Sequence, residues 1–342
     1  MTTGIIILYC IATVVAIASQ RFRIPHTVAL LLVGIGLGAT HLVPLPHLTK
    51  ELLFTIFLPG LLFEAAYHLE VGELRENAWT ISVLAIPGVV AAIALTAVLV
   101  MAGNRLGVGA TTVDWTTAFL FGGVIAATDP VAVTALFRQL GATRRLHVLV
   151  ESESLFNDGT SIVFLTLMLA YFAGNAPTGG SLAMSFLRIT AGGAVIGAVL
   201  GWGVSHIRTR VDDAAIEITV TTIAAYGSFV AAEYWHCSGV IATVVAGVVC
   251  GHSGRHHTMT ASSREAIKGF WEWLAFALNS AVFILLGAEV SPSVLASEWR
   301  LVLVAALAAL GARAIVVGAT GVALAGTRER VPARWLPVLA WG

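Results

Sequence analysis

Residues 150–165 read VESESLFNDGTSIVFL, and this stretch decides the fold that the sequence predicts. It lies in a run that otherwise has the composition of an apolar helix. Four polar side chains interrupt that run: Glu151, Glu153, Asn157 and Asp158. A carboxylate at mid-membrane costs roughly 2.5–3.5 kcal/mol on insertion scales and is tolerated where it meets a partner or a water-filled cavity. We therefore expect this helix to line a polar site inside a membrane protein.

The composition of the whole chain is that of a membrane protein. Of its 342 residues, 58% are hydrophobic and 11% are charged, whereas a soluble domain carries about 25% charged residues. The net charge is zero and no basic run is present, so nothing supports a nucleic-acid partner. Spanning a bilayer takes about 17–25 residues, and eleven apolar runs are long enough or nearly so: 3–19, 27–43, 50–69, 79–102, 115–138, 147–173, 181–207, 214–235, 238–252, 265–291 and 299–325. A twelfth begins near residue 335, so the sequence predicts an all-α polytopic membrane protein.

The basic residues are distributed unequally between the two sides of this arrangement. If the N-terminus lies outside, the outer loops hold only Lys50, Arg105 and Arg300, while Arg188 and Arg313 lie within spans. The other 14 of the 19 Lys and Arg residues then fall in inner loops, Arg208 among them. Because cytoplasmic loops are enriched in Lys and Arg, this count favours an outside N-terminus. Residues 1–19 lack the basic start and cleavage site of a signal peptide, so we expect them to form the first span.

Helical spacing sorts the polar residues of the opening stretch into two faces. Glu151, Ser154 and Asp158 are separated by three and four residues, so they share one face of a helix. Glu153 and Asn157 form a second pair on an adjacent face. Asp158 lies about eleven residues into its span, which places it near the middle of the membrane at about 1.5 Å per residue.

The preceding span contains the sequence IAATDPVAVTALF, residues 125–137. Pro130 has no amide to donate and disfavours helix at Asp129, so we expect the helix to break at Thr128–Asp129. A plain proline kink is the alternative. Broken helices at mid-membrane form ion sites in secondary transporters, and the polar Asp158 on the next span favours that interpretation.

Two further charges lie inside spans. Glu64 occurs in FLPGLLFEAAYH and Arg313 in LGARAIVVGA. A buried arginine requires an acidic partner, and we expect Glu153 to be that partner, with Asp129 as the second choice.

The oxygen-bearing residues Asp158, Ser154, Thr128 and Glu64 offer hard ligands. Hard oxygen ligands suit small hard cations such as Na⁺ and do not favour zinc or copper. No HExxH or paired-cysteine motif is present, so we expect no bound transition metal and no cofactor.

Two motifs carry a resemblance to a known family. ATDPVAV at 127–133 and ESLFNDG at 153–159 resemble the paired motifs of the monovalent cation–proton antiporters, in the sodium/proton exchanger branch that carries Asn-Asp. Further matches occur in the family's order along nearly the whole chain: FLPGLLFEAAYH, YWHCSGVIATVVAGVVCG, FILLGAEV and GARAIVVG.

The resemblance implies a fold of about thirteen helices with inverted repeats and crossed discontinuous helices, assembled as a homodimer. It implies electroneutral exchange of Na⁺, or of K⁺ or Li⁺, for H⁺ at Asp158 by alternating access. Within a single transmembrane domain of residues 1–342, we expect 79–173 and 299–342 to form the ion-binding bundle, and 1–70 and 181–291 the dimerisation scaffold. The bacterial inner membrane is the expected location.

The resemblance also implies a role for each motif residue. By position, Ser154 and the backbone of Thr128 resemble further cation ligands, and Asp129 and Asn157 resemble the partners that hold the crossed helices. Glu64 is similar to an acid at the cytoplasmic approach to the site. The pair Glu153 and Arg313 is expected to be structural. Members of the family continue beyond LPVLAWG with a second broken helix, so we expect the C-terminal helices to be missing from these 342 residues.

Rival interpretations are weaker. An intramembrane aspartyl protease needs a GxGD motif that the chain lacks, and a passive channel fits one acidic cluster among many helices less well than alternating access does. GIGLGA at 34–39 follows no strand, so Gly34 and Gly38 predict close helix packing and not nucleotide binding. His252, His256 and His257 are expected in a cytoplasmic loop, and the sequence does not decide whether that loop senses pH.

Overall fold

Every regular element in the described part of the computed structural model is a helix. The structure describes residues 2–22, 24–40, 43, 45–105, 113–128, 133, 137, 143–174, 181–211, 213–256, 261–327 and 329–341. Asp129, Pro130 and His257, which the sequence singled out, lie outside these residues. The longer helices are α1 (Thr2–Phe22), α2 (His26–Thr40), α4 (Leu58–His68), α7 (Val89–Arg105), α8 (Trp115–Ile125), α10 (Arg144–Phe172), α11 (Leu182–Arg208), α12 (Ala214–Tyr234), α13 (Gly239–His256), α14 (Ala261–Glu289) and α16 (Trp299–Ala323).

Short helical segments connect or extend the long ones. They are α3 (Lys50–Leu52), the π-helix η1 (Leu53–Phe57), α5 (Val71–Glu76), α6 (Ala78–Val83), the π-helix η2 (Leu84–Gly88), α15 (Pro292–Ser297), the 3₁₀-helix η3 (Ala333–Trp335) and α17 (Leu336–Trp341). Each π-helical turn accompanies a proline, Pro87 within η2 and Pro59 just after η1. Proline lacks the amide that a regular turn requires, and a wider turn accommodates that loss.

Ten of the eleven predicted spans coincide with one helix or one continuous run of helical segments. Six of these are long and apolar enough to cross a bilayer, and α1, α2, α8 and α13 contain shorter apolar helices. The chain is therefore a multi-pass membrane protein, while the count of eleven spans stays a prediction. The fifth run, predicted as 115–138 with a helix break inside it, contains α8, which ends at Ile125, and most of its residues after Thr128 lie outside the described part of the chain. One expectation was wrong, because His252 lies on α13, which continues through Gly254 to His256.

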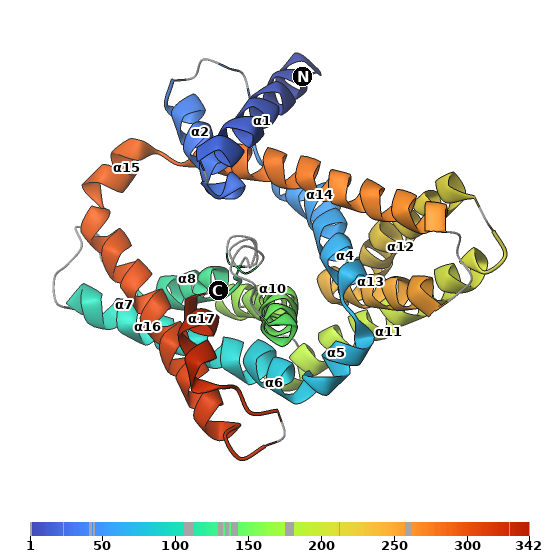
Figure 1. The fold of residues 1–342 in the computed structure, drawn as a ribbon. Helices are drawn as coiled ribbons and strands as arrows, with labels where there is room; N and C mark the ends of the chain where they lie inside the picture. Colours follow the sequence, from blue (N-terminus) through green and yellow to red (C-terminus); the bar gives the residue numbers. More distant parts are fainter. Residues whose placement is uncertain are drawn as a thin grey trace.

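The helices pack as two groups. One group contains α6, η2, α7, α8 and α16, and the other contains α2, α4, α11, α12, α13 and α14. Helix α5 lies between α4 and α6 and connects the two groups (Figure 1). In the second group, α2 and α14 approach so closely that a Cβ at Gly34 or Gly38 would overlap the backbone of α14, which confirms the packing role predicted for these glycines.

Helix α10 is the element that both groups share. It contacts α8, α6, η2 and α7 on one side, and α4, α11 and α13 on the other. Figure 1 shows it in the middle of the molecule, beside α8 and α6. The stretch that interrupts the apolar pattern of the sequence therefore lies at the junction of the two helix groups.

Candidate functional site

Helix α10 buries most of the polar stretch with which the sequence analysis began. Ser154 and Asn157 are each 1% exposed and Glu153 is 2% exposed, while Asp158 is half-buried. Gly159 lies within this helix and faces α13, where an added Cβ would lie only 3.0 Å from the Ile241 side chain. Glycine thus allows α13 to approach the helix one residue after Asp158.

The neighbouring helix α8 ends beside Ser154 and Asn157 of α10. Asp114 caps its N-terminus by accepting a hydrogen bond from the Thr117 amide at 2.9 Å, and the helix ends at Ile125, with Ala126, Ala127 and Thr128 outside it. The interruption therefore begins three residues before the predicted Thr128–Asp129 position. The carbonyl of Ala126 is satisfied from another helix, because the Asn157 amide donates to it at 2.7 Å.

Four of the predicted site residues lie where α10 meets the segment that follows α8. Asn157 Nδ2 also approaches Thr128 Oγ1 at 3.3 Å, and Thr128 Oγ1 lies 3.1 Å from Ser154 Oγ. Asp158 follows Ser154 by one turn on α10. The structure therefore brings the hydroxyls of Thr128 and Ser154 and the amide of Asn157 together across the end of α8, on the helix that carries Asp158.

Glu64 lies on α4, which packs beside α10 through Leu62, Ala66 and Leu155. Its carboxylate is 3.3 Å from His68 Nδ1, one turn further along the same helix, and the same nitrogen lies 2.9 Å from the Glu64 carbonyl oxygen. Both side chains remain partly exposed, at 23% for Glu64 and 29% for His68. Glu64 is thus placed next to a histidine that the sequence analysis did not consider.

Glu153 and Arg313 form a two-pronged ion pair between α10 and α16. The guanidinium donates to the two carboxylate oxygens at 3.1 and 2.7 Å. The Glu153 side chain is almost fully buried, and the Arg313 side chain is 18% exposed. Parallel hydrogen bonds of this kind fix geometry as well as charge, so the pair ties α16 to the turn of α10 that precedes the site.

Two of the cavities in the described part of the chain lie near the site. One of about 460 Å³ lies between α8 and α16, and Thr128 and Arg313 are part of its lining. The other, of about 1100 Å³, is lined by α10 from Ile162 onward and also by Glu51, Glu233 and His236. Ile162 follows Asp158 by one helical turn, so the first α10 residue that lines the larger cavity lies about 6 Å along the helix axis from Asp158.

The sequence analysis missed Ser161. Its hydroxyl donates to Asn157 Oδ1 at 3.0 Å, and both side chains are buried. The signal was present in the sequence, because Ser161 follows Asn157 by four residues and therefore lies on the same helical face.

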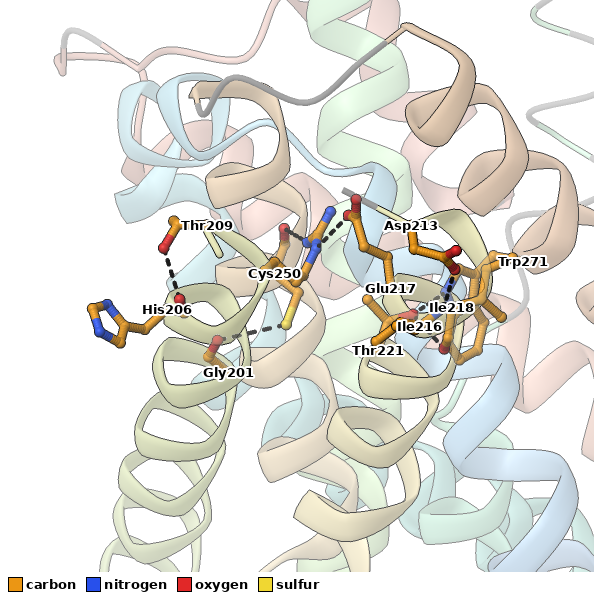
Figure 2. A network of polar contacts seen from close by, with 11 residues as sticks. Gly201, His206, Thr209, Asp213, Ile216, Glu217, Ile218, Thr221, Cys250 and Trp271 are labelled. Carbon is orange, nitrogen blue, oxygen red and sulfur yellow. Dashed lines mark hydrogen bonds and ion pairs between the residues drawn. The ribbon is translucent and has the colours of Figure 1, made fainter. Parts of the chain in front are cut away.

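The sequence analysis also missed a buried polar network around Arg208, within the second helix group. Arg208, predicted in an inner loop, is the last residue of α11, and its side chain is only 4% exposed. It pairs with Glu217 at 3.2 Å and donates to the Cys250 carbonyl at 3.1 Å. Figure 2 shows Glu217 and Cys250 in this network, and Trp271 donating to Thr221 nearby. These contacts join α11, α12, α13 and α14.

The arrangement presents oxygen atoms suited to a hard cation. Thr128 and Ser154 contribute hydroxyl oxygens, and Asp158 contributes the negative charge that would balance a cation. Such ligands favour Na⁺ or another alkali cation over transition metals. A half-buried carboxylate also binds a proton, so the same group has two chemically plausible partners.

Comparisons with known proteins agree on one family. Residues 6–342 match the family described as "Sodium/hydrogen exchanger, transmembrane". The chain is 34% identical over 339 residues to the Na⁺/H⁺ antiporter ApNhaP of Aphanothece halophytica, covering 97% of this chain and 63% of that protein. It is 36% identical over 298 residues to the low-affinity Na⁺/H⁺ antiporter NhaS1 of Synechocystis, covering 86% and 55%. The chain thus spans less than two thirds of the length of both relatives.

The fold also matches a solved structure. The sodium proton antiporter MjNhaP1 from Methanocaldococcus jannaschii, determined at pH 8, superimposes with a TM-score of 0.80 over 98% of this chain and 80% of that chain, at 18% sequence identity. At this identity the match establishes the fold, which is the antiporter fold that the sequence predicted.

Proposed function

Because the chain belongs to the sodium/hydrogen exchanger family, we propose that it is a secondary transporter that exchanges a monovalent cation for H⁺ across a membrane. Na⁺ is the first candidate, and K⁺ and Li⁺ are the alternatives. The observation that supports this proposal most is the meeting of α10 with the end of α8. There Asn157 holds the Ala126 carbonyl at 2.7 Å and the Thr128 and Ser154 hydroxyls lie 3.1 Å apart, beside Asp158.

In this proposal, Asp158 is the residue that alternates between the proton and the cation. Ser154 and Thr128 add oxygen ligands, and Asn157 holds the two helices in register. Asp129 follows Thr128 in the sequence, and we propose that it assists Asn157 in holding the helices. Glu64 is proposed to contribute from α4, where it accompanies His68.

Exchange becomes obligatory if the site changes its facing only when Asp158 is neutral. A bare carboxylate in an apolar barrier costs roughly 2.5–3.5 kcal/mol, which lowers the population of that state by about 100-fold. A proton or a monovalent cation each removes this cost by cancelling one negative charge. Because the two compete for the same carboxylate, one is carried in each direction and the cycle is electroneutral.

The separation of the helices into two groups supports an assignment of parts for such a cycle. We propose that residues 79–173 and 299–342 form the ion-binding bundle, and that 1–70 and 181–291 form a scaffold that also makes the homodimer. The Glu153–Arg313 pair is proposed to be structural, since it joins α10 to α16 within the bundle. Helix α5 connects bundle and scaffold.

The location of the site suggests how ions reach it. The cavity lined by Glu51 and Glu233 opens along α10 toward the end of the helix that the positive-inside rule places outside. Acidic side chains favour cations in such a cavity. We propose that the N-terminus faces the outside, that the basic loops face the cytoplasm, and that the protein resides in the inner membrane.

Asp158→Asn tests the proposal in proteoliposomes that contain the complete protein. An imposed Na⁺ gradient should drive H⁺ flux in the unaltered protein, and this flux should disappear in the variant because Asn cannot bind a proton in exchange for Na⁺. Asp213→Asn is the matched control, since Asp213 caps α12 by accepting from the Ala215 and Ile216 amides and asparagine caps equally well. Retained Na⁺-driven H⁺ flux in Asp158→Asn would reject the assignment, and Na⁺ flux without H⁺ counterflux in the unaltered protein would indicate a channel.

A further inference from the structure

A continuous row of polar contacts, buried at Ser161 and Asn157 and partly exposed at Thr128, extends the site by one helical turn beyond Asp158. It runs from the Ser161 hydroxyl to Asn157 Oδ1 at 3.0 Å, and from Asn157 Nδ2 to the Ala126 carbonyl at 2.7 Å and to Thr128 Oγ1 at 3.3 Å. It ends between Thr128 and Ser154 at 3.1 Å. Ser161 is the one member with no counterpart in the functions proposed above.

The chemistry of the partners fixes which atoms donate at Asn157. The Ala126 carbonyl can only accept, so the side-chain atom that faces it at 2.7 Å must be the amide nitrogen. The amide oxygen then faces Ser161, whose hydroxyl is the donor. Rotating the amide by half a turn would place its oxygen against the carbonyl oxygen of Ala126 and leave both without a proton. Ser161 and Ala126 therefore hold the amide of Asn157 from both ends.

The orientation of Asn157 in turn affects the two hydroxyls. A hydroxyl has one proton and two lone pairs, and Thr128 uses one lone pair to accept from Asn157. If Thr128 also accepted from Ser154, no lone pair would remain. If Thr128 instead donates to Ser154, each of the two hydroxyls keeps one lone pair. Only this second direction allows both oxygens to ligate a cation beside Asp158.

We propose that Ser161 is a positioning residue for cation binding: its hydrogen bond to Asn157 Oδ1 helps the Ala126 carbonyl to hold the amide against Thr128, and when Thr128 donates to Ser154 both hydroxyl oxygens keep a lone pair for the cation. This inference rests on the proposed function, and it assigns Ser161 no contact with the cation itself. Without the Ser161 hydroxyl, Asn157 Oδ1 becomes a buried acceptor without its donor, and the amide loses one of the two contacts that set its orientation.

The test compares three serine variants in the complete protein, reconstituted in liposomes. Ser161→Ala should raise the KM for Na⁺ by about tenfold, which corresponds to about 1.4 kcal/mol, while kcat stays within about twofold. Ser161→Cys should give an intermediate KM, since a thiol is a weaker donor of similar size. Ser152→Ala is the matched control: it lies on the same helix, is fully buried, and its hydroxyl makes no hydrogen bond within the described part of the chain. Its KM should equal that of the unaltered protein.

A binding measurement separates this inference from the proposed function. In detergent, Na⁺ should raise the melting temperature of the unaltered protein, and Ser161→Ala should need about ten times more Na⁺ for the same rise. If the unaltered protein shows no Na⁺-driven H⁺ flux, the proposed function fails while this binding comparison still tests Ser161.

Two results would overturn the role of Ser161. The first is a KM and a Na⁺-dependent melting curve for Ser161→Ala that match those of Ser152→Ala. The second is a fall in kcat with an unchanged KM, because that pattern indicates a general structural defect and not a loss of cation affinity. If Ser161→Ala does not accumulate in the membrane, Ser161→Cys provides the same comparison.

Discussion

Replacing Arg313 by methionine tests how the Glu153–Arg313 pair contributes to folding. The two hydrogen bonds of 3.1 and 2.7 Å would be lost, and the Glu153 carboxylate, 3% exposed, would remain without its cation. Breaking a buried pair by removing one member costs about 3–5 kcal/mol. Methionine preserves much of the volume and the flexibility of the arginine stem, so the loss of charge dominates the result.

The loss of stability in Arg313→Met cannot exceed the free energy needed to protonate Glu153. A stranded carboxylate can take up a proton instead of remaining charged. A glutamate ionises near pH 4.3 in water and each pH unit corresponds to about 1.4 kcal/mol, so neutralising one costs about 3.7 kcal/mol at pH 7 and about 1 kcal/mol at pH 5. The folded variant then holds a proton that the unfolded chain releases, so the stability of the variant falls as pH rises.

Thermal unfolding in detergent at several pH values measures this dependence. Each kcal/mol shifts the melting temperature by about 2 °C in a chain of this size, so Arg313→Met should lose about 7 °C at pH 7 and about 2 °C at pH 5 relative to the unaltered protein. The double variant Glu153→Gln/Arg313→Met should recover most of the loss at pH 7. Arg300→Met is the matched control on α16, since Arg300 is exposed and lies over the Trp299 ring. A loss at Arg313 that is the same at both pH values would refute the reasoning.

Three further outcomes are expected from thermal unfolding. Glu217→Gln leaves the buried Arg208 charged and without its carboxylate partner, and because arginine cannot release its proton the loss of about 3–5 kcal/mol should be the same at pH 7 and pH 5; a loss that shrinks between these two pH values would contradict this. Gly38→Leu should lower the melting temperature because it overlaps the α14 backbone, whereas Gly36→Leu, with open space around it, should not; equal effects would argue against this packing. Hydrogen bonds from Thr117 lower the pKa of Asp114, so the stabilisation of the fold by this cap is complete above the ordinary pKa of the carboxyl and is lost as pH falls through the lowered value. Asp114→Ala should therefore lower the melting temperature at pH 7 and leave it unchanged in strong acid. The same difference in melting temperature at both pH values would count against the cap.

Local pattern was sufficient to locate the helix that carries the site. The spacing of Ser154 and Asp158 placed them on one face of α10, and that of Glu153 and Asn157 on another, because helical periodicity is a property of neighbouring residues. The same periodicity applied to Ser161, but a serine within an apolar run attracts little attention. A hydroxyl can also satisfy itself on its own helix, as Thr160 does with the Phe156 carbonyl, so its partner is not visible in the sequence.

The interruption of α8 shows the limit of such patterns. Pro130 predicted a break at Thr128–Asp129, yet the helix ends at Ile125. Proline affects the backbone of the residue before it, but here the Ala126 carbonyl, four residues before Pro130, is held by Asn157 from another helix. A tertiary hydrogen bond therefore accompanies an end that the local sequence places later. The linker helix α5 was missed for a related reason, since six residues are too few to show a period.

The position of Arg208 illustrates how burial alters an inference from charge. The orientation rested on Lys and Arg in loops, and Arg208 was included although it is buried against Glu217. Its charge is neutralised inside the protein and does not contribute at the membrane surface. Without it, 13 inner residues remain against the outer Lys50, Arg105 and Arg300. The asymmetry is preserved because it depends on many loops and not on one residue.

The rotation of α10 about its axis is determined by three contacts made in different directions. Glu153 reaches Arg313 on α16, Asn157 reaches Ala126 at the end of α8, and Gly159 admits the side chain of Ile241 on α13. Adjacent residues on a helix differ by about 100°, so turning α10 by one position would break the ion pair, strand the Ala126 carbonyl and force a side chain against α13 together. Asp158 lies within this seven-residue segment. The direction in which its side chain leaves the helix is therefore set by its neighbours, and the exchange of proton and cation proposed for this carboxylate relies on that fixed position.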